Sequence, residues 1–286
     1  MSSSLRSWCI PALLSVLAFA ANSIFCRLAL ISGEIDAASF TVIRLFSGGV
    51  FLWLLLQLRS PKVQIGGNWR GGFALFIYAY LFSVAYVELD AGIGALLLFG
   101  AVQITMFVGA WLGGEKLRAR AVLGMVIAFT GLISLLLPSA HAPKLSSTLW
   151  MLLSGTAWGL YSLWGKGAKD PLAATTGNFI RSLPLLLVLL AVIALNGNAT
   201  PQWSGIGYAL ASGIFASGAG YAVWYSVVTR LCAQQAATLQ LSVPVLAAIG
   251  GVLFLGEALT MHLALPSLVV LGGVMTALIP APKKQP

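Results

Sequence analysis

Glycine, proline and charged residues divide the chain into ten apolar spans joined by short loops, and this succession constrains the fold more than any other feature. A membrane-spanning helix needs about 20 apolar residues, so ten of them would use roughly 200 positions. The spans are continuously apolar rather than alternating, and backbone in lipid must satisfy its own hydrogen bonds, so we expect helices. The expected spans are residues 8–31, 37–58, 70–89, 91–113, 119–138, 147–166, 171–195, 204–229, 231–255 and 259–280.

The charge pattern predicts orientation rather than a soluble partner. Charged residues make up 8% of the chain, against roughly 25% in soluble domains. The net charge of +9 comes from basic residues scattered singly between apolar runs, with no basic stripe of the kind that binds nucleic acid. If the N-terminus is cytoplasmic, 12 of the 16 basic residues lie inside and only Arg27 and Lys144 lie outside, which favours cytoplasmic termini. We expect a multi-pass protein of a bacterial-type inner (plasma) membrane.

The first span imitates a secretory signal, because Ala18-Phe19-Ala20 looks like a cleavage site. The apolar run continues to Ile31, which is longer than a signal core, and its pattern recurs later in the chain. We therefore expect the first helix to be retained. The cysteines, Cys9, Cys26 and Cys232, lack ligand-like spacing and are expected to be buried thiols.

The two halves of the chain resemble each other. Ser15 to Arg27 (SVLAFAANSIFCR) matches Ser154 to Lys166 (SGTAWGLYSLWGK), and Arg27 thereby pairs with Lys166. Further matches join Ile43-Arg44 to Ile180-Arg181, Gly114-Glu115-x-Leu117 to Gly256-Glu257-x-Leu259, Gly131 to Gly273, and Pro138 to Pro280. Similar composition of Leu-, Ala- and Gly-rich helices is the alternative, but it does not explain matches in one order.

An odd number of spans per repeat inverts the second repeat relative to the first. We expect an all-α integral membrane fold with ten transmembrane helices as two inverted five-helix repeats around a central cavity. The repeats cover residues 1–140 and 141–286. In this plan the substrate binds near the midplane, between the repeats.

One segment resembles a known family. Residues 236–248 (AATLQLSVPVLAA), followed by Gly256-Glu257-Ala258-Leu259, are similar to the ninth helix of the drug/metabolite transporter superfamily in its ten-helix EamA-type form. The first repeat departs from that pattern, with Val102-Gln103 in place of Pro244-Val245. The resemblance implies that helices one to four and six to nine surround the cavity, with five and ten to one side. Aromatic-rich spans without carboxylates look most like the YddG-type aromatic amino-acid exporters.

Residues for chemistry are missing from the spans. His141 and His262 lie in or beside outer loops, and no Asp or Glu lies in the middle of a span. Clustered nucleophiles, bases or metal ligands are therefore absent, so we expect neither an enzyme nor a metal or cofactor site. Without a membrane carboxylate to carry a proton, transport of neutral or zwitterionic cargo is not expected to require proton antiport.

Aromatic and polar side chains within the spans predict the cavity lining. Aromatic walls favour a flat apolar side chain, and an indole N–H at the bilayer centre needs a polar partner, which a wet cavity would supply. Amide and hydroxyl groups can bond a zwitterionic head. The expected substrate-binding residues are Asn22, Tyr78, Phe82, Trp158, Tyr161, Ser162, Tyr221, Trp224 and Gln240. For each of them, ordinary helix packing is the alternative.

Three further residues have hinge or structural roles in this interpretation. Arg44 and Arg181 lie deep in their spans, where a charge is costly, and either bind cargo or tie helices together through backbone carbonyls. Pro244 is the expected hinge, because a proline ring frees a backbone carbonyl near Gln240.

These features predict a secondary-type transporter that exports aromatic and other bulky neutral amino acids by alternating access. The alternatives are other cargo, such as purines or cationic compounds, an uptake carrier, and a membrane scaffold or lipid-handling protein. The expected partners are the small-molecule substrate and the lipid bilayer, without nucleic acid, and a monomer suffices.

Overall fold

The computed structural model describes residues 3–59, 64–115, 119–135, 143–196, 201–231, 236, 239–258 and 260–278, and these residues form helices and connecting segments without a strand. Five helical stretches are long and apolar enough to cross a membrane, and shorter apolar helices accompany them. The expected all-α fold of a membrane protein is confirmed. The helices of the first half are α1 (Ser3–Ile31), α2 (Ala37–Arg59), α3 (Trp69–Tyr86), α4 (Ala91–Leu112) and α5 (Ala119–Leu135).

The second half is more interrupted than the sequence predicts. Its elements are α6 (Leu145–Gly165), α7 (Pro171–Ser182), η1 (Leu183–Leu185), α8 (Leu186–Asn196), α9 (Trp203–Ala211), η2 (Ser212–Ala219), α10 (Gly220–Val228), α12 (Val243–Leu255) and α13 (Met261–Leu278). Pro184 lies in the 3₁₀ turn that separates α7 from α8, because a proline cannot donate the next helical hydrogen bond. The segment η2 is a π-helix, a form that is rare and often lies at functional sites.

A second interruption lies next to Pro244. Residues 239 and 240 are helical, Leu241 and Ser242 form a turn, and α12 then begins with Pro244 in its first turn. Proline suits this position because the N–H it lacks would have no helical partner there. The expected continuous span over 231–255 is therefore broken, and part of it, residues 232–235 and 237–238, lies outside the described residues.

Polar residues just before helices satisfy the first free N–H groups. Asp36 accepts hydrogen bonds from the N–H groups of Ala38 and Ser39, both 2.9 Å long. Asn68 caps α3 through the N–H of Gly71, and Asp170 caps α7. Such caps, with side-chain oxygens on the N2 or N3 amide, fix where these helices begin.

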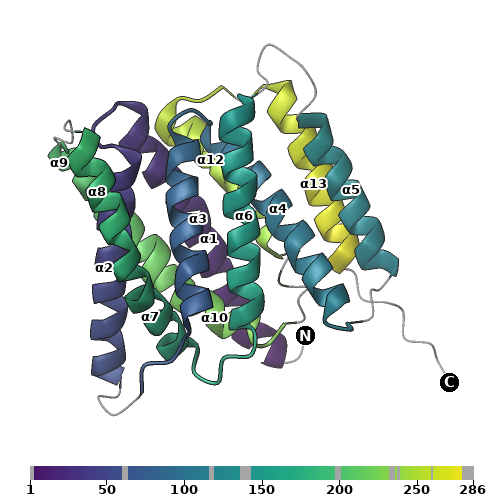
Figure 1. The fold of residues 1–286 in the computed structure, drawn as a ribbon. Helices are drawn as coiled ribbons and strands as arrows, with labels where there is room; N and C mark the ends of the chain where they lie inside the picture. Colours follow the sequence, from purple (N-terminus) through teal and green to yellow (C-terminus); the bar gives the residue numbers. More distant parts are fainter. Residues whose placement is uncertain are drawn as a thin grey trace.

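The helices α5 and α13 lie side by side at one edge of the molecule (Figure 1). We call the interface between α5 and α13 the seam. A glycine from each helix lets the two backbones approach closely there. A Cβ atom on Gly131 would lie 2.8 Å from the Pro266 carbonyl oxygen of α13, and one on Gly273 would collide with the backbone of Gly124 in α5. The two glycines that match between the repeats thus play reciprocal roles in one helix pair.

Away from the pair of α5 and α13, α6 packs against both α3 and α4 (Figure 1). A Cβ atom on Gly155 would collide with the backbone of Leu98 in α4, and one on Gly159 would lie 2.7 Å from the side chain of Thr105 in the same helix. The Ser154 hydroxyl donates to the carbonyl oxygen of Tyr78 at 2.8 Å. Small residues on this face let the helices approach closely, and the approach positions the aromatic side chains of α6 in the protein centre.

Candidate functional site

Buried aromatic side chains from five helices, α1, α3, α6, α7 and α10, meet in the centre of the molecule. The ring of Trp158 on α6 lies 4.6 Å from Tyr221, 4.9 Å from Tyr78, 5.2 Å from Tyr161 and 5.4 Å from Phe19, measured between centroids. We call this group the aromatic cluster; its members are Phe19, Tyr78, Phe82, Trp158, Tyr161, Phe179, Tyr221, Trp224 and Tyr225.

The helical spacing seen in the sequence accounts for most of this cluster. Trp158 and Tyr161 share one face of α6, and Tyr221 and Trp224 share one face of α10, as expected for positions three residues apart. The structure brings all six expected aromatic side chains into contact. It also adds Phe179 of α7, whose ring lies 5.8 Å from Tyr221 and which the sequence reasoning did not select.

The indole N–H of Trp158 donates to Oε1 of Gln240 over 2.7 Å. We expected a wet cavity to supply this partner, so the structure corrects the expectation: a glutamine side chain fills the role. The Gln240 amide in turn donates to the carbonyl oxygen of Ala236 at 3.3 Å and contacts the sulfur of Met106 at 3.6 Å. The bond joins α6 to the segment just before the break at Pro244.

Arg44 of α2 lies against the aromatic cluster and is fully buried. Its Nε donates to Oγ of Ser217 at 2.9 Å, and its Nη2 donates to the hydroxyls of Tyr221 at 2.6 Å and Tyr78 at 3.1 Å. The guanidinium carbon lies 5.0 Å from the ring centroid of Phe82, within the range of a cation–π contact. Ser217, on the π-helix η2, is a partner that sequence reasoning missed.

Arg181 behaves differently from Arg44, its counterpart in the repeat. Its Nη1 donates to the carbonyl oxygens of Gly66 at 2.7 Å and Gly177 at 2.9 Å. The first bond ties α7 to the segment before α3, and the second stays within α7. Of the two arginines, only Arg44 lies beside the cluster.

Polar side chains complete the site. Asn22 of α1 donates to the Tyr78 hydroxyl at 3.2 Å and accepts from the Ser212 hydroxyl at 2.6 Å. The hydroxyl of Ser162 and the indole N–H of Trp224 are buried, and neither has a hydrogen-bond partner among the described residues. Unsatisfied buried groups cost free energy unless another partner binds them.

A cavity of about 500 Å³ approaches the cluster from one end of the bundle, the end at which α1 begins (Figure 1). It lies between the segment that precedes α3 and the loop from α6 to α7, and its lining includes Gly66, Asn68, Trp164, Lys169, Asn178 and Tyr225. Tyr225 also belongs to the cluster, with its ring 5.2 Å from that of Tyr161. Tyr225, in the cavity wall, therefore contacts Tyr161, and Tyr161 in turn contacts Trp158.

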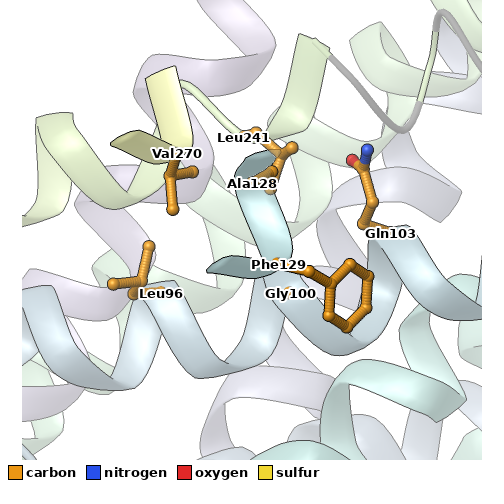
Figure 2. Close-up of a pocket in the computed structure, with 7 residues that line it drawn as sticks. All are labelled: Leu96, Gly100, Gln103, Ala128, Phe129, Leu241 and Val270. Carbon is orange, nitrogen blue, oxygen red and sulfur yellow. The ribbon is translucent and has the colours of Figure 1, made fainter. Parts of the chain in front are cut away.

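A second pocket is too small for a metabolite. Figure 2 shows it between α4, α5 and α13, lined by Leu96, Gly100, Gln103, Ala128, Phe129, Leu241 and Val270. Its volume is about 10 Å³, which is the space of one water molecule. This pocket is a packing feature beside the seam of α5 and α13.

Ion pairs occupy both ends of the bundle. At the end of α1, Arg27 lies 3.3 Å from Asp90 and 3.7 Å from Glu257, and Glu257 accepts a 2.9 Å hydrogen bond from the N–H of Ala91. Burial raises the pKa of Glu257 above its usual value. At the opposite end, Lys166 pairs with Glu115.

The two pairs link residues that match between the repeats, since Arg27 corresponds to Lys166 and Glu257 to Glu115. Each pair also crosses from one half of the chain to the other.

The described residues contain no group of three His, Cys, Asp or Glu side chains that could hold a metal ion. All seven acidic residues lie between helices rather than within them. Cys26 is a buried free thiol. Cys232, His141, Pro138, Pro280 and the side chains of Cys9 and His262 lie outside the described residues.

Comparison with known proteins identifies a family and a fold. The model of the EamA-like transporter family matches residues 6–137 and 145–279. A solved crystal structure shares the fold, with a TM-score of 0.71 over 93% of this chain and 95% of the other at 19% identity.

Several curated proteins are similar in sequence. An uncharacterized protein of Pseudomonas aeruginosa is 56% identical over 85% of both chains. A threonine/homoserine exporter, RhtA, of Salmonella typhimurium is 28% identical over 78% of this chain and 75% of its own. A probable amino-acid metabolite efflux pump of Escherichia coli is 24% identical over 69% of this chain and 71% of its own.

Proposed function

The chain belongs to the EamA-like transporter family, and we propose that it exports aromatic and other bulky neutral amino acids across a bacterial inner membrane by alternating access. The observation that carries the proposal is the aromatic cluster around Trp158. It joins side chains of α1 and α3 from the first half to side chains of α6, α7 and α10 from the second. A binding site between halves that move against each other can be exposed to either side in turn.

Amino-acid cargo agrees with the names of relatives. One is described as a probable amino-acid metabolite efflux pump and another as a threonine/homoserine exporter. The preference for aromatic side chains is our extension, because stacked and edge-on ring contacts favour a flat apolar group. The polar groups of Asn22, Ser162 and Gln240 supply donors and acceptors for the charged head of an amino acid.

Alternating access requires one closed and one open end. The ion pairs of Arg27 with Asp90 and Glu257 hold the far end of α1 against the start of α4 and the segment after α12. The 500 Å³ cavity lies at the opposite end, which the charge bias assigns to the cytoplasm. On this proposal, residues 1–140 and 141–286 are inverted halves and the described conformation accepts cargo from inside, with Pro244 as a hinge.

The absence of acidic residues from the described helices favours transport without proton antiport. Buried carboxylates are the usual proton carriers in membrane pumps. Here each carboxylate lies in a connecting segment, and the buried one, Glu257, is held by the N–H of Ala91 and by Arg27. A carrier of zwitterions down their gradient needs no such relay.

Efflux from intact cells tests this function. Cells that overproduce the protein are loaded with phenylalanine- or threonine-containing dipeptides, and the amino acids that leave are measured. We expect faster release of phenylalanine than in cells with the empty vector, and loss of the difference when Trp158 is changed to Ala. Release of purines or cationic compounds without any amino acid would instead support the alternative cargo.

A further inference from the structure

We propose that Arg44 is the anchor for a carboxylate group of the cargo, so that the protein selects ligands by their carboxylate as well as by their aromatic ring. The inference deepens the proposed function and rests on it. The sequence analysis allowed Arg44 either to bind cargo or to join helices. This inference gives Arg44 the binding role, with a monocarboxylate as the ligand.

The first argument is the uncompensated charge. Arg44 has no exposed surface, and none of the ion pairs among the described residues involves it. Guanidinium stays protonated in proteins, and a buried charge without a counter-ion is costly. Its hydrogen-bond partners among the described residues are the hydroxyls of Ser217, Tyr78 and Tyr221, and it also lies against the rings of Tyr78 and Phe82. An anion that enters the site would supply the missing charge.

The second argument is an excess of donors around one oxygen. The Tyr78 hydroxyl oxygen lies within hydrogen-bond distance of three donors, which are the amide of Asn22 at 3.2 Å, Nη2 of Arg44 at 3.1 Å and the hydroxyl of Tyr221 at 3.1 Å. Each phenol oxygen has two lone pairs and one hydrogen of its own. Whichever way the Tyr78–Tyr221 bond runs, the two hydroxyls together are therefore offered one hydrogen more than they can accept. In addition, Nη1 of Arg44 is buried without a partner among the described residues. A carboxylate has about four lone-pair sites and can accept two parallel bonds from one guanidinium.

The third argument is the contrast with Arg181. If an arginine here served only to join helices, backbone carbonyls would be its natural acceptors, and Arg181 has two such partners. Among the described residues, Arg44 donates to side-chain hydroxyls and to no backbone carbonyl, and hydroxyls can rotate away when a stronger acceptor arrives.

The fourth argument is position. Tyr221 bonds Arg44 through its hydroxyl, and its ring lies 4.6 Å from the centroid of Trp158. One tyrosine therefore separates the guanidinium from the indole that we propose as the stacking surface. An aromatic amino acid carries a carboxylate and a ring on one small molecule, so one molecule can reach both groups once the cluster opens.

The test is a competition series with the purified full-length protein in proteoliposomes. Exchange of labelled phenylalanine is inhibited by unlabelled phenylalanine, 3-phenylpropionate, phenylalaninamide and phenethylamine. The first two carry the carboxylate and the last two lack it. Because hydrogen bonds to charged groups contribute about 1.5–3 kcal/mol, the ligands without the carboxylate should inhibit at least about tenfold more weakly.

Two variants then assign the preference to one residue. Arg44→Gln should reduce the ratio between phenylalaninamide and phenylalanine inhibition to near one, and Arg44→Lys should retain part of it. The matched control, Arg181→Gln, removes an arginine at the corresponding position of the other repeat and should keep the wild-type ratio.

The outcomes separate this inference from the proposed function. Phenylalanine exchange with equal inhibition by the acid and the amide overturns the anchor while the function stands. If the protein exchanges aromatic carboxylic acids but not amino acids, and Arg44→Gln loses this exchange, the anchor stands and the proposed cargo is wrong. If Arg44→Gln does not fold, Arg44→Lys carries the test beside the wild-type ligand series, and a wild-type ratio in Arg44→Lys overturns the anchor.

Discussion

Replacing Trp158 with alanine should weaken the binding of aromatic cargo far more than the binding of aliphatic cargo. Trp158 is 2% exposed and contacts four rings within 5.4 Å. A cargo ring that displaces one of them would gain one aromatic pair, about 0.5–1.5 kcal/mol, and would bury roughly 60 Å² of one face at about 25 cal/mol per Å². The sum, about 2–3 kcal/mol, corresponds to a loss of roughly 30- to 150-fold in affinity.

The assay is equilibrium binding of labelled tryptophan and threonine to purified protein. Removing a buried tryptophan also costs about 3–5 kcal/mol of stability, so binding is measured only on the monodisperse fraction from size exclusion. Trp158→Phe keeps most of the volume and should lose less affinity for tryptophan. Trp150→Ala is the matched control, because Trp150 lies on the same helix but is 41% exposed.

Equal losses for tryptophan and threonine in Trp158→Ala would refute the reasoning, since a general collapse of the site does not distinguish ring from methyl. So would an unchanged affinity for tryptophan.

Further substitutions probe other parts of the account. Asn22→Leu should lower the exchange rate several-fold, since it removes the bonds to Tyr78 and Ser212; an unchanged rate would show that Asn22 has no part in transport. Pro244→Ala should slow exchange more than it weakens binding, and equal losses would count against a hinge. Asp170→Ala should lower stability by about 1 kcal/mol, whereas Asp170→Asn keeps the helix cap. The Ala173 N–H and Arg59 lower the pKa of Asp170 against the effect of burial, so this contribution is present at neutral pH and is lost as pH falls below about 4. Thermal melts at several pH values check it, and a stability difference that persists at acid pH would contradict it.

The helices and the aromatic residues of the cluster were accessible from sequence because both follow local rules. Continuous apolar runs predict membrane helices, and positions three residues apart, such as Trp158 and Tyr161, share a helix face whatever the rest of the fold does. The match of Gly131 with Gly273 was also visible in the sequence, but that each of them faces the helix of the other is a finding of the structure.

The surroundings of Arg44 were not accessible in this way. Its partners Ser217 and Tyr221 lie 173 and 177 residues further along the chain. Their direction depends on the π-helix η2, whose extra residue per turn is set by tertiary packing and has no reliable sequence signal. Sequence reasoning therefore identified the arginine as costly but could not place it beside the cluster.

The partner of Trp158 was missed for a related reason. An indole N–H at the bilayer centre needs an acceptor, but the sequence alone does not say whether water or a side chain provides it. Gln240 reaches the indole because the helix breaks just after it, at Leu241 and Ser242.

The most direct test of the central claim is counterflow in proteoliposomes. Vesicles that contain the protein are preloaded with phenylalanine, and labelled tryptophan, threonine, adenine and a lipophilic cation are supplied outside, each with and without a pH gradient. The account predicts transient accumulation of tryptophan that requires no pH gradient. Accumulation of adenine or the cation alone, or uptake of any amino acid only when a pH gradient drives it, would contradict the account.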